Sequence, residues 1–362
     1  MKIFLDTNVF YNDYFMKNAN FKYLFHFLNN EEHELILSEL VIQEVENIRN
    51  REVRSSLAEI KKNIKIIQKL NLSKVEYEEN TLGIQEYKLL PLIDEKVESH
   101  QVFDYENIPH REVVNRALIN KKPFIEGEKG YRDTLIWLSL LNYLSEQKIT
   151  NEEVIFITEN KSDFFKVKNK KISFHKDLIE DFVANDIKTK ITPYTSLFDF
   201  VNSTIDQNDH AIDRVNLELI LEEYVESEGE NYLENMTNTD LSEYLEDSIF
   251  ESRVKEILEI RTDVSEGLED TVIEQTTKME GNDIYVSYSF NLRRVTLEID
   301  IPEVDYIENQ SELYRLFNDI DISSGIATLT AYVRPYFNVS FIYNDRKNTL
   351  SDFDVAHLWL RR

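Results

Sequence analysis

The chain has 362 residues, of which 42% are hydrophobic, so it is long enough for more than one core. It has no cysteine, which excludes disulfides and thiolate metal sites and favours a reducing compartment. Its net charge of −27 argues against phosphate binding, which usually depends on Lys and Arg. No secretory signal and no apolar run of roughly 18 residues is present, so we expect a soluble, cytoplasmic protein without membrane contact.

Short apolar runs alternate with helical patterns through the first 200 residues. Buried strands are predicted at residues 2–5, 34–37 and 154–158, with weaker ones at 172–174 and 190–193. Helical spacing is found at residues 14–28, 38–70, 91–99, 111–118 and 133–144, and Ser38 is expected to cap the second of these helices. This alternation predicts an α/β domain at residues 1–205, with a central parallel sheet flanked by helices.

The second half of the chain differs in charge and in pattern. Residues 201–362 carry 13 Lys and Arg against 35 Asp and Glu, whereas residues 1–200 carry 28 against 33. Acidic helices are predicted at residues 212–260, and antiparallel strands at residues 271–343, with a hairpin turn at 280–283. We therefore predict a second, acidic α+β domain at residues 206–362.

Four acids occupy positions that a parallel sheet would bring together. Asp6 directly follows the first strand, and Asp163 follows the turn after the strand at 154–158. At about 100° per residue, Glu44 falls inside the apolar stripe of its helix, and Asp133 heads the stripe of a later helix. Glu39 and Glu46 fall on the opposite, solvent-facing side. Strand ends and helix starts of this kind meet at the carboxyl edge of such a sheet, so we predict one crevice for the four acids.

Each of these acids also has an ordinary structural interpretation. A salt bridge to an inward Lys or Arg, or a solvent-exposed margin of the stripe, is the alternative explanation of Glu44. Asp133 in a first helical turn can cap the helix or complement its dipole, and Asp163 can be a turn residue. The hypothesis of a shared site depends on the set of four rather than on any one acid.

Four carboxylates in one crevice repel one another, and a hard divalent cation such as Mg²⁺ is a suitable partner. Such an ion can orient and deprotonate a water and neutralise charge on a phosphate, which is the chemistry of phosphodiester hydrolysis. Polar residues beside the acids are expected to hold the carboxylates or the metal-bound waters: Thr7, Asn8, Thr158 and Asn160.

These stretches together resemble a known family. Leu-Asp-Thr-Asn at 5–8, Gly-Tyr-Arg-Asp-Thr-Leu-Ile-Trp at 130–137 and Thr-Glu-Asn-Lys-Ser-Asp-Phe at 158–164 resemble a PIN-domain nuclease, over about residues 1–195. The long interval before Asp133 is more similar to a larger PIN-like subgroup than to compact toxin proteins. The resemblance implies a three-layer α/β/α fold, Mg²⁺- or Mn²⁺-dependent cleavage of RNA, usually single-stranded, and a role in toxicity or defence.

The resemblance also implies roles for individual residues. Asp6, Glu44 and Asp133 match the three principal acids of the family. Many members have an acid two residues after the Thr, where this chain has Asn160, so Asp163 is the candidate for the fourth acid. By this resemblance the four acids are the catalytic, metal-binding residues.

Two basic segments flank the proposed catalytic acids. Residues 109–132 contain six Lys and Arg against three Glu, and residues 161–176 contain six Lys against one acid. We expect these segments to contact nucleic acid through Arg111, Arg116, Lys122, Lys129, Arg132, Lys161 and Lys166. Phe124, Tyr131 and Phe164 are candidates to stack on bases, although solvated lysines and buried aromatic residues would give the same pattern.

The predicted function is a metal-dependent endoribonuclease, with two alternatives. One is a structure-specific DNA nuclease, and the other is a catalytically silent PIN-like module that binds RNA or protein. A haloacid-dehalogenase-type phosphatase is disfavoured because position 8 is Asn rather than a second Asp. Residues 206–362 show no catalytic signature, and we expect them to bind a protein partner, form a homo-oligomer, restrain the nuclease by covering its basic segments, or serve as a scaffold.

Overall fold

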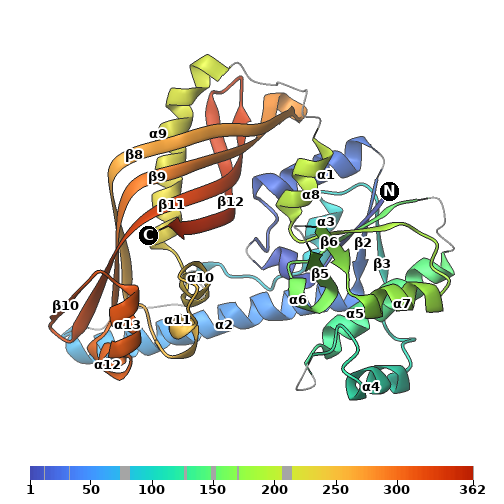
Figure 1. Cartoon of the computed structure of the whole chain (residues 1–362), viewed down its shortest axis with the longest axis horizontal. Coiled ribbons are helices and arrows are strands. Elements are labelled where there is room, and N and C mark those ends of the chain that lie inside the picture. Colours follow the sequence, from blue (N-terminus) through green and yellow to red (C-terminus); the bar gives the residue numbers. More distant parts are fainter. Residues whose placement is uncertain are drawn as a thin grey trace. The chain divides into compact units, whose positions relative to one another are not determined.

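The structure is a computed structural model, in which residues 1–11, 13–31, 33–73, 82–125, 129–147, 152–168, 171–205 and 214–361 are described (Figure 1). Contacts divide the chain into an N-terminal unit, Met1–Lys17 with Phe21–Val201, and a C-terminal unit, Asn18–Asn20 with Asn202–Arg362. Separate folding of two domains at 1–205 and 206–362 stays a prediction, because a division by contacts does not test it.

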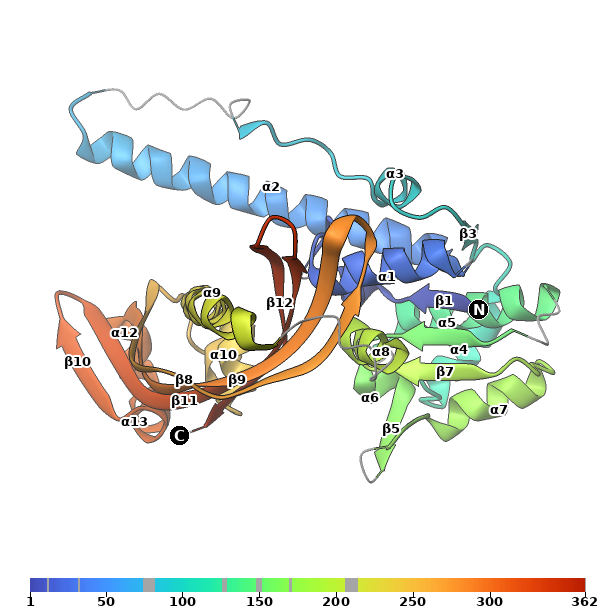
Figure 2. The same cartoon turned by 90° about the horizontal axis from the view of Figure 1, so that it is seen from above.

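Parallel strands form the central sheet of the N-terminal unit, in the order β3-β2-β1-β4-β7. The strands are β1 (Lys2–Leu5), β2 (Glu34–Ser38), β3 (His100–Phe103), β4 (Val154–Ile157) and β7 (Ile191–Tyr194). β1 and β4 are buried along their whole length, as expected for parallel strands covered on both faces. Figure 2 shows helices on both sides of this sheet, so the predicted parallel sheet flanked by helices is confirmed.

The predicted helices of this region are present in the predicted order, whereas the helices at residues 161–164, 176–184 and 197–204 were not predicted. Together the helices are α1 (Ala19–Asn30), α2 (Glu39–Leu70), α3 (Leu89–Asp94), α4 (His110–Leu118), α5 (Tyr131–Glu146), α6 (Lys161–Phe164), α7 (Lys176–Ala184) and α8 (Leu197–Thr204), with a 3₁₀ turn at Thr7–Phe10. Ser38 caps α2, because its hydroxyl accepts from the Leu40 N–H at 3.3 Å. Within the described residues, every helix is too short or too polar to span a lipid bilayer.

Two strands of the N-terminal unit also differ from the prediction. β3 was not predicted, because it is an edge strand with two exposed residues in its middle and therefore lacks a continuous apolar run. The strand predicted at 172–174 lies in β6 (Lys171–Phe174), which pairs with β5 (Phe165–Lys168) in a separate antiparallel hairpin and does not join the central sheet.

The C-terminal unit is built on a long antiparallel sheet with the order β10-β11-β9-β8, and β12 pairs with β11 (Figure 1). The strands are β8 (Glu259–Lys278), β9 (Asp283–Pro302), β10 (Asp319–Ser323), β11 (Ile326–Asn344) and β12 (Thr349–Arg361). The helices are α9 (Arg214–Glu234), α10 (Asn238–Tyr244), α11 (Ile249–Ser252), α12 (Glu303–Glu308) and α13 (Gln310–Leu316). Leu221 and Val225 of α9 join Phe290 and Leu292 of β9 in one core, so α9 covers one face of the sheet.

The antiparallel prediction for the C-terminal half is confirmed, but its boundaries were too narrow. β8 begins at Glu259, inside the region predicted as helical, because exposed charged residues alternate along it and mask the strand pattern. β12 lies beyond the predicted limit at residue 343. The turn at 280–283 joins β8 to β9 as predicted, and Gly281 and Asn282 have left-handed φ values of 66° and 69°.

Gly130 ends the loop that leads into α5, and its backbone has a φ of +101°. A Cβ at this position would stand 2.6 Å from the carbonyl oxygen of Pro123. We expect Gly130→Ala to lower the free energy of unfolding by about 2–4 kcal/mol, since the clash adds to the cost of left-handed backbone. Urea unfolding followed by circular dichroism measures this loss.

Gly83→Ala is the matched control, because Gly83 has a φ of +61° but open space around the added Cβ. It should cost only about 1 kcal/mol. Equal losses in the two variants would show that the contact with Pro123 does not matter.

Candidate active site

Asp6 is buried and lies one residue beyond the end of β1. Its Oδ1 accepts from the Thr7 N–H at 2.8 Å, and its Oδ2 accepts from the Thr158 hydroxyl at 2.6 Å. Thr158 directly follows β4, the strand paired in parallel with β1. Two adjacent strands therefore end at this carboxylate, at the edge of the sheet where ligands commonly bind.

Glu44 lies near the start of α2, and its side chain is only 9% exposed. Its Oε2 accepts from the Thr7 hydroxyl at 3.0 Å, and its Oε1 forms an ion pair with Arg132. Glu44 therefore points inward, as predicted, and also forms the salt bridge that was the alternative explanation. Glu46, which was expected to face solvent, instead accepts from the Leu89 N–H at 3.0 Å, because α3 packs over this part of α2.

One side-chain amide joins the other two acids. Asp133 lies in the first turn of α5, and Asp163 lies in α6. Asn160 Nδ2 is 3.4 Å from Asp133 Oδ1 and 2.9 Å from Asp163 Oδ2. Asp163 Oδ1 also accepts from the Ser162 hydroxyl at 3.0 Å and lies 3.7 Å from Lys122 Nζ.

Asn8 links the loops that follow β1 and β4. Its Nδ2 donates to Thr158 Oγ1 at 3.2 Å, and its Oδ1 accepts from the Glu159 N–H at 3.2 Å. Thr158 Oγ1 in turn accepts from the Asn160 N–H at 3.1 Å. Each of the four polar residues predicted to support the carboxylates thus takes part in one hydrogen-bond network around them.

Burial and like charge raise the pKa of two of the four carboxyls. Burial raises the pKa of Asp6 to about 7, and the negative charges of Asp133 and Glu44 raise it further. The hydrogen bonds that Asp6 accepts from Thr158 and Thr7 oppose this rise. Burial and the charge of Asp163 raise the pKa of Asp133. Glu44 has a cationic partner and so has Asp163, whereas the described residues give no ion pair to Asp6 or Asp133. The centre of the site therefore has an excess of negative charge.

The donor set suits Mg²⁺ or Mn²⁺, which prefer oxygen ligands. Mg²⁺ often takes only one or two carboxylates and keeps several waters, and Asp6 and Asp133 meet that requirement. In the described part of the chain, however, no three His, Asp or Glu side chains are arranged to hold one ion. That all four acids bind metal stays a prediction, and in this arrangement Arg132 contacts the carboxylate of Glu44 and Lys122 that of Asp163.

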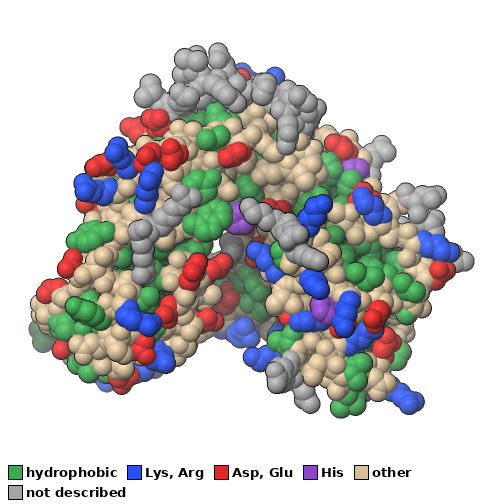
Figure 3. Space-filling model, viewed as in Figure 1, with side chains coloured by type: hydrophobic (Ala, Val, Ile, Leu, Met, Phe, Trp, Pro, Cys, Tyr) green, Lys and Arg blue, Asp and Glu red, His purple; other side chains and the backbone are tan. Residues whose placement is uncertain are grey.

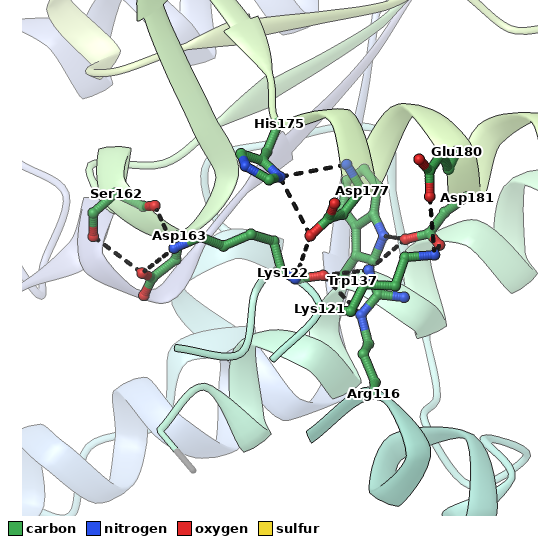
Figure 4. Close-up of polar contacts among 10 residues, drawn as sticks. All are labelled: Arg116, Lys121, Lys122, Trp137, Ser162, Asp163, His175, Asp177, Glu180 and Asp181. Atoms are coloured by element: carbon green, nitrogen blue, oxygen red, sulfur yellow. Dashed lines mark hydrogen bonds and ion pairs between the residues drawn. The ribbon is translucent and has the colours of Figure 1, made fainter. Parts of the chain in front are cut away.

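Lys122 is fixed beside Asp163 through both of its backbone polar groups (Figure 4). Arg116 Nε donates to the Lys122 carbonyl at 2.7 Å, and the Lys122 N–H donates to Asp177 Oδ2 at 3.1 Å. The Lys122 ammonium then donates to the Ser162 carbonyl at 2.9 Å. The loop that carries Lys122 is thereby held between α4 and α7.

A buried ion pair anchors this arrangement. The guanidinium of Arg116 pairs with Asp181 of α7, which also accepts from Trp137 Nε1 at 2.9 Å and Lys121 Nζ at 2.8 Å (Figure 4). Hydrogen bonds and charge from Arg116 and Lys121 lower the pKa of Asp181 although burial opposes them. The sequence analysis did not predict roles for Asp177 and Asp181, which follow the basic segment at 161–176.

Several predicted nucleic-acid contacts need correction. Arg116 is only 4% exposed and is committed to Asp181, so the prediction that it contacts nucleic acid is wrong. Phe124 and Phe164 are fully buried in the core and cannot stack on bases, whereas Tyr131 is exposed.

The other predicted contact residues keep surface positions. Lys122 is partly buried, and exposed side chains are found at Arg111, Lys129, Arg132, Lys161 and Lys166. Figure 3 shows several Lys and Arg side chains on the face of the N-terminal unit that is in view.

The comparison with protein families identifies this part of the chain. Residues 3–164 match the PIN domain family, and this stretch includes Asp6, Glu44, Asp133 and Asp163. The N-terminal part of the protein is a PIN domain. Searches of curated proteins and of solved structures found no significant match. PIN domains are generally nucleases, so the family indicates hydrolysis of nucleic acid as the class of activity.

The pKa of Asp6 makes a prediction about stability in the absence of metal. Its folded-state value of about 7 lies above the ordinary value of 3.8, so ionisation as pH rises through this interval destabilises the fold. We expect Asp6→Asn to raise the free energy of unfolding, with a gain that grows by roughly 2 kcal/mol between pH 5 and pH 8.

Urea unfolding in EDTA across this pH range measures the gain. Asp186→Asn, at an exposed acid of the same unit, is the control and should show no such trend. A gain for Asp6→Asn that does not change with pH would contradict the raised pKa.

The Arg116–Asp181 pair makes a second prediction about stability. Arg116→Met leaves Asp181 and the Lys122 carbonyl buried without their guanidinium partner, and should cost about 3 kcal/mol. Thermal unfolding with Arg111→Met as control checks this, because Arg111 is exposed on the same helix and should change stability by less than about 0.5 kcal/mol. Similar effects in the two variants would argue against a buried network.

Proposed function

We propose that the protein is a metal-dependent endoribonuclease that hydrolyses phosphodiester bonds of single-stranded RNA. The observation that carries the proposal is the convergence of four acids from separate elements, where burial and mutual repulsion raise the pKa of Asp6 and Asp133. Such crowding of carboxylates in a PIN domain is best relieved by a divalent cation.

Asp6 and Asp133 are the principal ligands in this proposal, and Glu44 and Asp163 join them when their cationic partners move to the substrate. Bound Mg²⁺ or Mn²⁺ would supply an activated water and neutralise charge that develops on the phosphate. Thr7 and Thr158 hold the Asp6 carboxylate in one orientation, and Asn160 keeps Asp133 and Asp163 together. Because ionised Asp6 is the metal-binding form, metal affinity should rise with pH up to about pH 7.

Basic side chains around the acids support a nucleic acid as the substrate. Arg132 is 61% exposed beside Glu44, and Lys122 lies beside Asp163, so both cations can reach a phosphate placed over the carboxylates. Arg111, Lys129, Lys161 and Lys166 are exposed and extend the basic surface. A role in toxicity or defence, a cytoplasmic location, and a protein partner or homo-oligomer contact through the acidic C-terminal unit remain part of the proposal.

Cleavage of labelled single-stranded RNA in Mn²⁺, with flap DNA in parallel, tests this function. We expect cleavage of the RNA, loss of activity in EDTA, and a fall of at least about 100-fold in Asp6→Asn and Asp133→Asn, because each removes a charge that holds the ion. Glu44→Gln should fall by at least about tenfold.

Glu59→Gln is the matched control on α2, because Glu59 is an exposed acid of the same helix, remote from the site. It should retain wild-type activity. Equal activity of wild type and Asp6→Asn in Mn²⁺ would falsify the nuclease proposal, and cleavage of flap DNA alone would replace RNA with DNA as the substrate.

A further inference from the structure

A cleft rich in arginine lies on the sheet of the C-terminal unit. It has a volume of about 580 Å³ and is lined by Arg293, Arg294 and Thr296 of β9, and by Tyr332 and Arg334 of β11. None of the described residues lining it is acidic. Residues 201–362 contain only 13 Lys and Arg, and three of these line this one cleft. Arginine is therefore concentrated here although the unit as a whole is acidic.

Irregular strand pairing at one level of the sheet creates the cleft. The register between β8 and β9 shifts between Val264 and Glu266, and the register between β9 and β11 shifts between Val333 and Tyr336. Leu292 and Val295 both belong to the core on the α9 side, so the two arginines between them face away from that core. A regular strand would send these two side chains to opposite faces, whereas the bulge places both on one surface.

Acids at the side of the cleft orient the guanidinium groups. Arg293 Nε lies 2.9 Å and Arg294 Nη1 3.3 Å from the carboxylate of Glu266. Arg334 Nη2 lies 2.7 Å from Glu269 and 3.4 Å from Asp270, and Glu269 is also 3.8 Å from Arg293 Nε. These contacts use only some of the five N–H donors of each guanidinium. Arg334 Nε is buried, and no hydrogen-bond acceptor for it is found among the described residues. The cleft therefore presents several fixed donors to an anion.

Tyr332 adds an anchored aromatic ring to these donors. Its backbone N–H donates to Asn318 Oδ1 at 3.0 Å, and its hydroxyl lies 3.1 Å from Asp319 Oδ2. The residue nevertheless stays 53% exposed. Guanidinium forks bind phosphate oxygens, and an aromatic side chain can stack on a base, so the two together match a nucleotide.

We propose that this cleft binds a nucleoside monophosphate, with the phosphate on Arg293, Arg294 and Arg334 and the base on Tyr332. Its volume lies in the range of small-ligand sites, about 300–1,000 Å³. A long RNA strand is a poorer fit, since the acidic unit around the cleft repels a polyanion, whereas one phosphate gains short contacts with three cations. The inference is independent of the nuclease site in the PIN domain.

Isothermal titration calorimetry on the full chain in EDTA tests the proposal with AMP, inorganic phosphate and adenosine. We expect AMP to bind at least tenfold more tightly than phosphate, and adenosine to give no detectable heat. Arg294→Gln and Arg334→Gln should each weaken AMP binding at least tenfold. Tyr332→Ala should weaken AMP binding while leaving the affinity for phosphate within twofold of wild type. This result would show that the adenine base contacts the ring of Tyr332.

Three further variants separate binding from folding and from the other unit. Arg253→Gln is the matched control, because Arg253 is an exposed arginine of the same unit paired with Glu312 at 2.8 Å, and its AMP affinity should not change. Arg294→Lys keeps the charge without the fork and should give an intermediate loss. Asp6→Asn should bind AMP like wild type, and the melting temperature of each variant verifies its fold.

Four outcomes would overturn the proposal. They are absence of AMP binding at millimolar concentration, an equal loss in Arg253→Gln, loss of binding in Asp6→Asn, and binding of an RNA oligonucleotide alone through the same arginines. The third would place the nucleotide in the PIN domain, and the fourth would assign the cleft to RNA.

Discussion

The burial of four mutually repelling carboxylates, which come from the ends of β1 and β4 and the starts of α2 and α5, is the constraint on which the PIN domain depends. The chain offsets this repulsion with hydrogen bonds from Thr7, Thr158 and Asn160 and with two cations, Arg132 and Lys122. Asp6 and Asp133 remain without a cation in the described part of the chain, and their raised pKa values record the remaining cost. A site of this kind is destabilised as it ionises, which suits it to bind a divalent cation near neutral pH.

The stability of the fold and the geometry of the site are connected through the loop that carries Lys122. Arg116 and Asp181 are buried together, and a buried pair of this kind is expensive unless each remaining donor and acceptor is satisfied. Here Trp137, Lys121 and the Lys122 carbonyl meet that need. The same contacts set the position of a lysine beside Asp163. Arg116, which was predicted to bind the substrate, thus stabilises the fold instead. Lys122 places its ammonium beside the carboxylate of Asp163.

Net charge is a poor guide to either unit of this protein. The N-terminal unit places its basic side chains around an acidic centre, as phosphate chemistry requires. The C-terminal half carries 35 acids, yet a shift in strand register gathers three arginines in one cleft, where the acids beside them engage only some of their N–H donors. Local geometry decides which charges meet a ligand, because exposed charges farther away than about a Debye length are screened.

The sequence by itself determined the elements whose signals are local. Apolar runs indicated β1 and β4, helical spacing placed Glu44 and Asp133 on inward faces, and the cap at Ser38 and the turn at Gly281 follow from local backbone chemistry. Only the tertiary structure decided the position of β3 at a sheet edge, the burial of Arg116 and the pairing of Arg132 with Glu44. Each of these depends on residues far apart in the chain, and no window of sequence contains both partners.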